Sequence, residues 1–491
     1  MKKVISLICT AAVSVSGIVA AMPAEISSLL TASAEESDKV STVSFDEATG
    51  ILTLSGLVDS GEVRKYKDNE KVKKIVAEEG TVFPAICADL FEGSCAEEID
   101  LSNVDISNAY TMAYMFGWCR NLKSIDLSCL DTSNINSLKG LFCCCSNLEE
   151  VNLSNLNTAK VKDMTYMFNN CPKLTSVDVS GFDTSHVTNL FGMFEMCTAL
   201  TSLDLSKWNT YQVNDMRAMF FDCHALKELN ISIDTSSVAD MANLFWNCSS
   251  LTKLDLSSFD TSEVRSMNGM FSGCSSLTEL DLSGFNTSKV VNMGKMFYGC
   301  SSLTKLDLSS FSTASLIDIE QEYKSFVDLH DMQFGVGKMF AGCKSLKTIY
   351  VSDRWRFKTE LPRSDYTFYE CKKLVGGNGT GYDQFETHYQ YARVDTAEAP
   401  GYFTYKAAEK PLITGDFDAD DCISVEDAQG VLNVYTALCA DNPVSLTAAQ
   451  KTASDVNSDG SIDCADAQII LLYYVSNTLC GQNVTWDELL G

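Results

Sequence analysis

The sequence has few of the residues on which most catalytic sites depend. Only four histidines occur among 491 residues, at His186, His224, His330 and His388, and none stands in an HExxH arrangement. The sequence contains no nucleophile elbow, Walker loop or dinucleotide fingerprint. It also lacks a basic patch to offset its formal net charge of -28. Phosphates would repel this much carboxylate, which argues against nucleic acid or an anionic membrane surface as a partner.

Long apolar runs are confined to the N-terminus. Lys2 and Lys3 precede a run of small apolar residues, and an Ala-x-Ala cleavage site follows from Ala32 to Ala34. This order predicts an export signal over 1–34 that is removed by cleavage, with an uncleaved membrane anchor as the alternative. No second apolar span follows, so we expect a secreted protein that is free or held at the cell surface by a partner.

The middle of the chain repeats one unit, which is clearest from Leu251 to Ser276. A fixed period of this length is typical of a solenoid. The large apolar groups of one unit, at ~1.5 to 3 kcal/mol each, do not offset the roughly 40 kcal/mol of entropy lost on ordering its residues. We therefore expect the units to fold only as a stacked array. Cysteines mark the period, 26 residues apart with one step of 25, at Cys119, Cys145, Cys171, Cys197, Cys223, Cys248, Cys274 and Cys300.

Each unit combines a predicted strand with a predicted helix. The first half, LTKLDLS, alternates apolar and polar residues from Leu251 to Ser257, which predicts a short strand. The second half places apolar residues at three- and four-residue spacing from Val264 to Phe271, which predicts a short helix or 3₁₀ turn. The sequence therefore predicts an α/β solenoid.

Twenty cysteines in an exported chain would normally suggest disulfides. Cysteines at one repeat position stack about 4.8 Å apart with parallel side chains, whereas a disulfide needs Cβ atoms roughly 3.8 Å apart and a near-perpendicular torsion. We therefore expect the ladder from Cys119 to Cys300 to consist of buried free thiols. Cys143 and Cys144, beside the ladder member Cys145, have no place in this pattern.

The period fails at both ends of the array. The N-terminal end predicts a cap with a hairpin that turns at Gly50, and Cys95 begins a shortened first repeat. An insert at about 317–334 is either a binding loop or a tolerated decoration. The predicted boundaries are 35–90 for the N-terminal cap, 91–354 for the array, 355–405 for a C-terminal cap, 406–411 for a linker and 412–491 for a separate module.

The repeat pattern MFxxCxxLxxLDLSxFDTSxV resembles the BspA-type leucine-rich repeats of bacterial surface proteins over roughly 91–404. The LVGGNGTxYD and PGYF segments at Leu374 and Pro400 also resemble the usual end of such arrays. The resemblance implies adhesion or ligand binding rather than catalysis, and leaves the protein or glycan ligand unidentified.

One column of the predicted strand face varies from repeat to repeat, while the Asp and Ser columns beside it hardly change. We expect this variable column to face a ligand; the alternative is solvated surface. The stacked Asp carboxylates are all equivalent, so none has the contrast in environment that a catalytic pair requires. The variable column is Ser124, Glu150, Ser176, Ser202, Glu228, Lys253, Glu279 and Lys305.

The last module contains two acidic segments 39 residues apart, GDFDADDCISVEDAQ and DVNSDGSIDCADAQ. Calcium takes oxygen ligands from positions 1, 3, 5, 7, 9 and 12 of a twelve-residue loop, so the module predicts two calcium ions. Gly460 fills the sharp turn of the second loop, where the first has Asp421. The predicted ligands are Asp416, Asp418, Asp420, the Cys422 carbonyl, Ser424 and Asp427 in the first loop, and Asp455, Asn457, Asp459, the Ser461 carbonyl, Asp463 and Asp466 in the second.

At the twelfth position of each loop the module has Asp, where an EF-hand has Glu. Only the helix after each loop is evident in the sequence. The module closely resembles a type I-like dockerin, the small all-α tag that binds a cohesin on a cellulosomal scaffoldin. The resemblance implies that residues near each loop's last ligand recognise the cohesin. The familiar clostridial Ser/Thr pair is absent there, which makes the module more similar to ruminococcal dockerins. Pairing of Cys439 with Cys480 stays open. The implied recognition residues are Val425, Glu426, Gln429, Cys464, Ala465 and Gln468.

The sequence as a whole predicts a secreted, non-catalytic recognition protein that a calcium-dependent dockerin attaches to a polysaccharide-degrading cellulosome. Two alternatives remain open. Most dockerin-bearing chains are enzymes such as glycoside hydrolases, and a repeat array of this kind is also compatible with a structural surface spacer.

Overall fold

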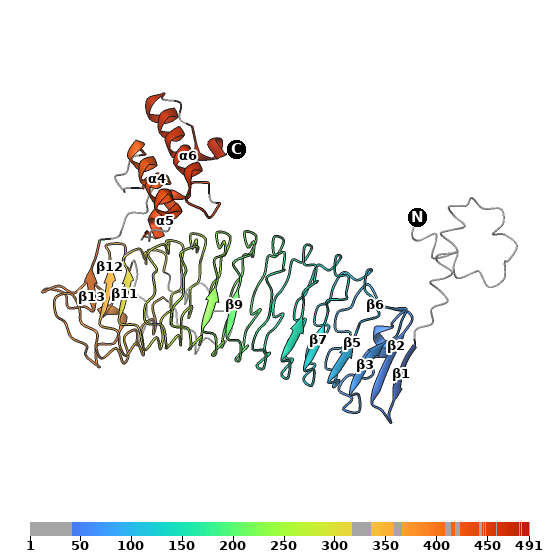
Figure 1. Cartoon of the computed structure of the whole chain (residues 1–491). Coiled ribbons are helices and arrows are strands. Elements are labelled where there is room, and N and C mark those ends of the chain that lie inside the picture. Colours follow the sequence, from blue (N-terminus) through green and yellow to red (C-terminus); the bar gives the residue numbers. More distant parts are fainter. Residues whose placement is uncertain are drawn as a thin grey trace, which may run out of the picture.

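The computed structural model describes residues 42–316, 335–357, 366–407, 414–417 and 423–490, apart from 441–443, 445, 447, 458, 481 and 483. Figure 1 shows a row of coils between an N-terminal and a C-terminal cap, and a separate group of helices near the C-terminus. The predicted export signal, the insert at 317–334 and residues 408–411 of the predicted linker lie outside the described residues.

The N-terminal cap is built on the predicted hairpin, in which β1 (Thr42–Asp46) and β2 (Ile51–Ser55) pair antiparallel. Gly50 adopts a left-handed φ of 72°, and its N–H donates to the Asp46 carbonyl (2.8 Å). The sheet continues in the order β1-β2-β3-β5, with β3 and β5 parallel to β2, so the cap leads directly into the first coils. The other elements of this region are α3 (Ser60–Arg64), β3 (Lys74–Ala77), β4 (Thr81–Val82), β5 (Glu98–Asp100) and β6 (Val104–Asp105).

The strand side of the coils, formed by the LxxLxL segments, has fewer strands than predicted. The strand expected from Leu251 to Ser257 is not formed, and neither 176–178 nor 279–281 pairs as a strand. Three parallel pairs do form (Figure 1). They are β7 (Ser124–Asp126) with β8 (Glu150–Asn152), β9 (Ser202–Asp204) with β10 (Glu228–Asn230), and β11 (Lys305–Leu308) with β12 (Thr348–Val351).

Wider ring spacing accompanies the interrupted strands. Where the strand segments end, stacked rings lie 6.4 Å apart between Phe182 and Trp208, and 6.3 Å apart between Phe285 and Phe311. Across the core, the ladder of buried phenylalanines keeps its ring centroids only 5.5 to 5.9 Å apart. The rings are therefore farther apart at two places on the strand side where neighbouring segments do not pair as strands.

The turn side of the coils is formed by the segments that carry Met, Phe and Cys. Its described residues contain turns with i to i-3 hydrogen bonds and no helix, so of the predicted helix or 3₁₀ turn the helix is wrong. In one coil the N–H groups of Leu190, Gly192, Phe194 and Met196 donate to carbonyls of the next coil rather than to residues four positions back. A chain of bridges from Ser137 to Gly335 follows the same direction. The intervening N–H groups, of Met193, Glu195 and Cys197, donate to carbonyls three residues back in the same coil. Neither set follows the i to i-4 pattern of a helix.

Two residues in each turn segment, four positions apart, make this inter-coil pattern possible. Gly192 and Met196 adopt left-handed φ angles of 58° and 60°, and their equivalents in the other coils do the same. Gly269 and Gly273 occupy the two positions in the coil from which the repeat was first read. Glycine suits such positions because it has no Cβ to clash with the preceding carbonyl.

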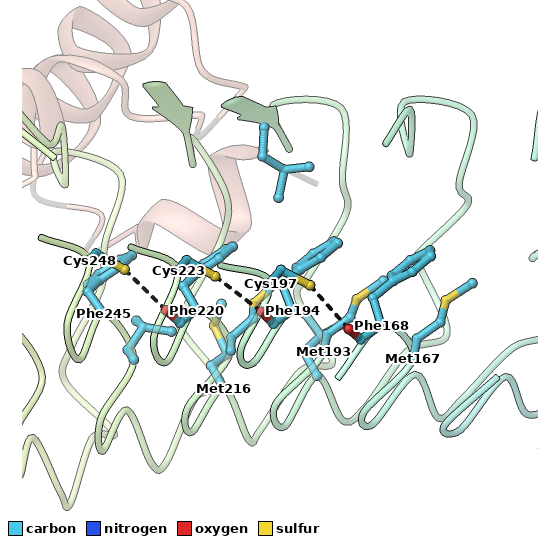
Figure 2. Packing of buried hydrophobic residues seen from close by; sticks show 14 of the residues in the cluster. Met167, Phe168, Met193, Phe194, Cys197, Met216, Phe220, Cys223, Phe245 and Cys248 are labelled. Carbon is cyan, nitrogen blue, oxygen red and sulfur yellow. Dashed lines mark hydrogen bonds between the residues drawn. The ribbon is translucent and has the colours of Figure 1, made fainter. Parts of the chain in front are cut away.

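The core of the array is a stack of identical side chains, as Figure 2 shows. Each ladder cysteine is buried and unpaired, which confirms the prediction of free thiols for Cys119 to Cys300. The sequence did not indicate their second function. The thiol of Cys223 donates to the carbonyl of Phe194 in the preceding coil, with 3.1 Å between Sγ and O, and the other ladder thiols repeat this contact.

The first repeat begins differently from the prediction, because Cys95 is not a ladder residue. Ser94 takes the ladder position, since its N–H donates to the Phe91 carbonyl as that of Cys119 donates to Phe116. At the other end the stack passes the insert without interruption. The thiol of Cys343 donates to the carbonyl of Phe297 (3.0 Å), so the coils on either side of 317–334 are direct neighbours.

The C-terminal cap closes the array with β13 (Phe403–Tyr405), which pairs in parallel with β12. The short 3₁₀ turn η2 (Tyr389–Tyr391) lies in the same cap. The Asp395 carboxylate holds the glycine-rich loop, accepting hydrogen bonds from the N–H groups of Asn378 and Thr380 (both 2.9 Å). This contact gives the GGNGT segment a structural function.

The C-terminal unit is helical, with a small core of its own around Val431, Val456 and Ile470. The start and the end of this unit are in contact through Trp486. The rings of Tyr473 and Trp486 stack with centroids 4.0 Å apart, and a Cβ on Gly415 would lie 2.8 Å from the Trp486 ring. Of the helices in the described part of the chain, none is long and apolar enough to span a membrane. The elements of the unit are α4 (Val425–Cys439), α5 (Ala448–Ser454), α6 (Cys464–Tyr474), the π-helical turn η3 (Val475–Leu479) and α7 (Trp486–Leu490).

Candidate functional sites

The variable column of the strand side is exposed at all eight predicted positions. Its members are in register where strands pair, as Ser124 with Glu150 and Ser202 with Glu228. The remaining members of the column are Ser176, Lys253, Glu279 and Lys305, and Lys253 and Glu279 form an ion pair with 3.3 Å between Nζ and Oε1. The column is thus a continuous exposed strip, available to a ligand.

The column of Asp residues beside the variable column stabilises tight turns, because each carboxylate accepts a backbone N–H two residues later. Asp178 Oδ1 accepts the N–H of Ser180 (2.9 Å), and Asn152 makes the same contact with Ser154 (3.2 Å). Hydrogen bonds from the following Ser, the side-chain contact foremost, lower the pKa of Asp126 and of Asp178. A carboxyl with a lowered pKa is ionised at neutral pH and is unsuited to act as a general acid.

The second acidic loop makes its sharp turn at the predicted glycine. Gly460, at the predicted sharp turn, adopts a left-handed φ of 83°, and its N–H donates to Asp455 Oδ2 (3.0 Å). Asp466 is fully buried, and its two carboxylate oxygens accept the N–H groups of Val456 (3.0 Å) and Asp463 (2.9 Å). The last predicted ligand therefore joins both ends of the loop. The other predicted ligands of this loop, Asn457, Asp459 and Ser461, are also described.

The first loop repeats these contacts 39 residues earlier. Asp427 is fully buried, and its oxygens accept the N–H groups of Phe417 (2.7 Å) and Ser424 (2.8 Å). Asp416 is buried as well. The predicted ligands Asp418, Asp420 and Cys422 lie outside the described residues. In the described residues, the hydrogen bonds of Asp427 thus match those of Asp466 in the second loop.

The chemistry of the donor set fits a hard cation. Burial raises the pKa of Asp455, and the nearby Asp466 adds to the increase; burial also raises the pKa of Asp466. Asp466 Oδ2 accepts one hydrogen bond, from the N–H of Asp463, and so keeps a second lone pair that could bind a metal. Within the described ranges, no group of three or more His, Cys, Asp or Glu side chains converges as a metal cluster. In the second loop these carboxylates instead accept backbone N–H groups, and a bound Ca²⁺ would draw the carboxylates together.

The residues implied in partner recognition lie at the start of α4 and α6, next to the loops. All are exposed except Ala465, which is partly buried. Apolar side chains continue this surface along both helices, since Leu432 and its equivalent Leu471 are 36% and 41% exposed. The other positions are Val425, Glu426, Gln429, Cys464 and Gln468, and Cys439, Cys464 and Cys480 are all unpaired and exposed.

The sequence reasoning missed the turn side as a candidate surface. Several of its variable positions carry partly exposed aromatic rings, at Tyr114, Trp118, Tyr166 and Trp246. Three of these rings lie on glycines of the next coil: for example, a Cβ on Gly192 would lie 2.5 Å from the Tyr166 ring. The signal was present in the sequence, because aromatic residues stand here at positions where several other repeats carry Gly or Asn.

These coils, with LxxLxL segments on one side and a buried Phe and Cys stack inside, define a leucine-rich-repeat solenoid. The family described as "Mycoplasma protein of unknown function, DUF285" matches residues 86–177, 110–233 and 227–333. The matches together span just over half of the chain, which therefore belongs to this family. No curated protein matches the sequence.

Similar solved structures include two bacterial leucine-rich-repeat proteins. The T. pallidum protein TpLRR is 16% identical, with a TM-score of 0.27, over 49% of this chain and 90% of its own. A leucine-rich-repeat protein from Eubacterium ventriosum is 15% identical, with a TM-score of 0.24, over 52% and 91%. At these TM-scores the assignment of the fold rests on the coil geometry of this chain.

Proposed function

We propose that this protein is an exported, non-catalytic recognition protein with two functional parts. The coils bind a protein or glycan ligand. The C-terminal unit is a calcium-dependent dockerin that binds a scaffoldin cohesin and so attaches the array to a polysaccharide-degrading cellulosome. Secretion and the cell-surface complex follow from this assignment.

The duplicated contact set around Asp427 and Asp466 carries the proposal. In each half a buried carboxylate accepts backbone N–H groups from position 2 and position 9 of the acidic loop, and a helix begins immediately after position 9. Such a duplication places two similar helix starts on one small unit. It supports a docking module that presents one face, or either of two faces, to a partner.

Exposed apolar residues support the same interpretation. Val425 is 47% exposed at the start of α4, and Leu472, on α6, is 50% exposed. A unit with so small a core would gain stability by burying these side chains, unless they serve an interface. For the array, the equivalence of its Asp column favours recognition over catalysis, because no member of the column differs chemically from its neighbours.

Calcium titration of the full chain, followed by a panel of scaffoldin cohesins, tests the docking part. Helix content should rise with calcium, because α4 and α6 are too short to persist without a folded unit. Cohesin binding should disappear in chelator and in the double variant Asp416→Ala, Asp455→Ala. The matched control Asp178→Asn removes one carboxylate from the array and should bind normally.

Two results would contradict this part of the proposal. Equal helix content in chelator and in calcium would exclude coupling of the ion to folding. Failure to bind any cohesin in calcium would remove the cellulosome assignment. For the array, glycan and protein arrays probed with the full chain should give at least one saturable ligand, and a spacer would give none.

A further inference from the structure

A cleft of about 560 Å³ opens where the N-terminal cap meets the first coils. Its volume falls within the range of small-molecule sites, roughly 300 to 1,000 Å³. Both the cap and the array contribute to its lining, so its shape depends on the junction between them. The lining includes Lys67, Asp68 and Lys73 of the cap and Trp118, Arg120 and Asn121 of the array.

The backbone under this cleft carries aromatic residues at positions where a left-handed conformation is required. Tyr114 and Trp118 occupy the two left-handed positions of their coil, at φ angles of 52° and 57°. A bulky side chain is unfavourable there because its Cβ crowds the neighbouring carbonyl. Of the described residues at this position, Trp118 is the one aromatic; the others are Gly93, Cys144, Asn170, Met196, Asp222, Asn247, Gly273, Gly299, Gly342 and Glu370.

The rings of Tyr114 and Trp118 stack on each other. Their centroids are 5.8 Å apart and their planes differ by 28°. The Tyr114 ring lies against Gly140 of the next coil, where any Cβ would overlap with it. Packing in the array thus accounts for Tyr114, whereas Trp118 is partly exposed and lines the cleft. A strained, partly exposed Trp in a cleft is better explained by ligand contact than by folding.

Polar groups with unused hydrogen-bonding capacity lie beside these rings. Asn121 Nδ2 donates to the Cys95 carbonyl (3.0 Å), which fixes the amide and leaves its Oδ1 as an acceptor. Lys67 pairs with Glu92 (2.8 Å). Within the described part of the chain, the charged groups of Lys73 and Arg120 form no ion pair or hydrogen bond with protein atoms. The cleft therefore offers both donors and acceptors next to an aromatic ring.

We propose that this cleft binds one end of a neutral oligosaccharide, with a sugar ring stacked on Trp118. The apolar face of an equatorially substituted pyranose fits a flat aromatic ring, and its hydroxyl groups need donors and acceptors at the edge of that ring. Acidic and basic side chains are equal in number in the lining, and the net charge of -28 disfavours an acidic polysaccharide. This inference rests on the proposed function of the array and names its ligand class.

Calorimetric titration of the full chain with cellohexaose, xylohexaose and mannohexaose, in calcium, tests the proposal. At least one of these sugars should bind with a single saturable site. Trp118→Gly should weaken that binding about tenfold or more through the lost stacking contact. Its Tm should equal or exceed that of the unchanged protein, because glycine relieves the left-handed strain. Loss of binding could not then be ascribed to unfolding.

Two further variants isolate the contribution of the ring. Trp118→Phe keeps a flat ring and should retain most of the affinity. Tyr211→Ala removes a tyrosine that is 47% exposed and absent from the cleft lining, and should have no effect. Affinity for all three sugars that is unchanged in Trp118→Gly would overturn the proposal. So would the absence of sugar binding, including the case in which only polygalacturonate or a peptide binds.

Cohesin binding, measured on the same preparations, separates this inference from the proposed function. If Trp118→Gly and the unchanged protein both bind cohesin but no hexasaccharide, the sugar site is wrong and the docking function stands. If hexasaccharides bind and cohesin does not, the sugar site stands and the docking function is wrong.

Discussion

Cys223 and Phe194 are linked by a thiol hydrogen bond that connects neighbouring coils. The Phe194 carbonyl accepts both the N–H of Cys197 in its own coil (3.1 Å) and the thiol of Cys223 in the next (3.1 Å). Burial raises the pKa of the Cys197 thiol to about 12. The ladder thiols therefore stay protonated and keep the hydrogen that they donate.

Thiol labelling should divide the cysteines into two groups. The buried ladder from Cys119 to Cys300 should resist alkylation in native buffer and react fully in denaturant, because these thiols are protonated and inaccessible. Cys129 and Cys439 are exposed and should react without denaturant. Mass mapping of the labelled peptides provides the measurement. Disulfides between successive ladder residues would contradict the hydrogen-bonded arrangement.

Removing one ring from the phenylalanine stack should destabilise the array strongly. Phe220 is fully buried between Phe194 and Phe245, at ring distances of 5.9 and 5.7 Å. Phe220→Ala should cost about 3 to 5 kcal/mol in the free energy of unfolding through lost burial and a cavity. Phe385→Ala is the control, since that side chain is 77% exposed and should cost little. Chemical denaturation measures both.

Glycines in the turn segments should differ sharply in their tolerance of alanine. A Cβ on Gly269 would lie 2.5 Å from both the Trp246 ring and Asn243 Oδ1, at a left-handed φ of 62°. Gly269→Ala should therefore lower the free energy of unfolding by about 1 to 2 kcal/mol. Gly181→Ala has no heavy atom within 4 Å of the new Cβ and should be close to neutral. Equal effects would contradict the role of the left-handed positions.

The Asp column should make the array sensitive to acid. Hydrogen bonds from Ser180 hold the pKa of Asp178 below its usual value of 3.8. A carboxyl with a lower pKa in the folded state stabilises that state above its unfolded pKa, and the contribution is lost as the pH falls through the folded pKa. Repeated over several coils, this effect should reduce the Tm below about pH 4.

A neutral acceptor provides the matched variant. Asp178→Asn copies Asn152, which accepts the same hydrogen bond in another coil, and should change stability little at pH 7 while reducing the acid sensitivity. Asp178→Ala loses the acceptor and should cost about 1 kcal/mol at pH 7. Thermal melts at pH 3, 4 and 7 measure these effects. An acid sensitivity that persists unchanged in Asp178→Asn would assign it to other groups.

Features that recur with the repeat period could be predicted from the sequence. The alternation of apolar and polar residues and the period of the repeat together predicted the buried cysteines, the hairpin at Gly50 and the exposed strip that includes Glu228. The helix expected from Val264 to Phe271 was wrong because its apolar spacing suits a helix and a turn equally. The choice between them depends on hydrogen bonds to the neighbouring coil, which lie 25 or 26 residues away in sequence.

The overlooked signal was the identity of the small residues. Asn243 and Asn247, or Gly269 and Gly273, stand four apart in successive repeats, where a helix would place good helix formers. Such a pair indicates two left-handed residues. The same positions point to the candidate sugar site, because Trp118 is the one aromatic residue at its position among the described coils. The spacing between coils, which differs where strands do not pair, has no local sequence signal.

The hydrogen-bonding pattern of the turn side also bears on how such arrays change during evolution. Each coil bonds only to the coils directly before and after it, and the Cys343 contact with Phe297 shows that the stack accepts a long insertion between them. Gain or loss of a whole unit by recombination would thus leave both caps and every remaining contact intact. Array length is then free to drift between relatives, while selection for a ligand acts on single exposed residues, one coil at a time.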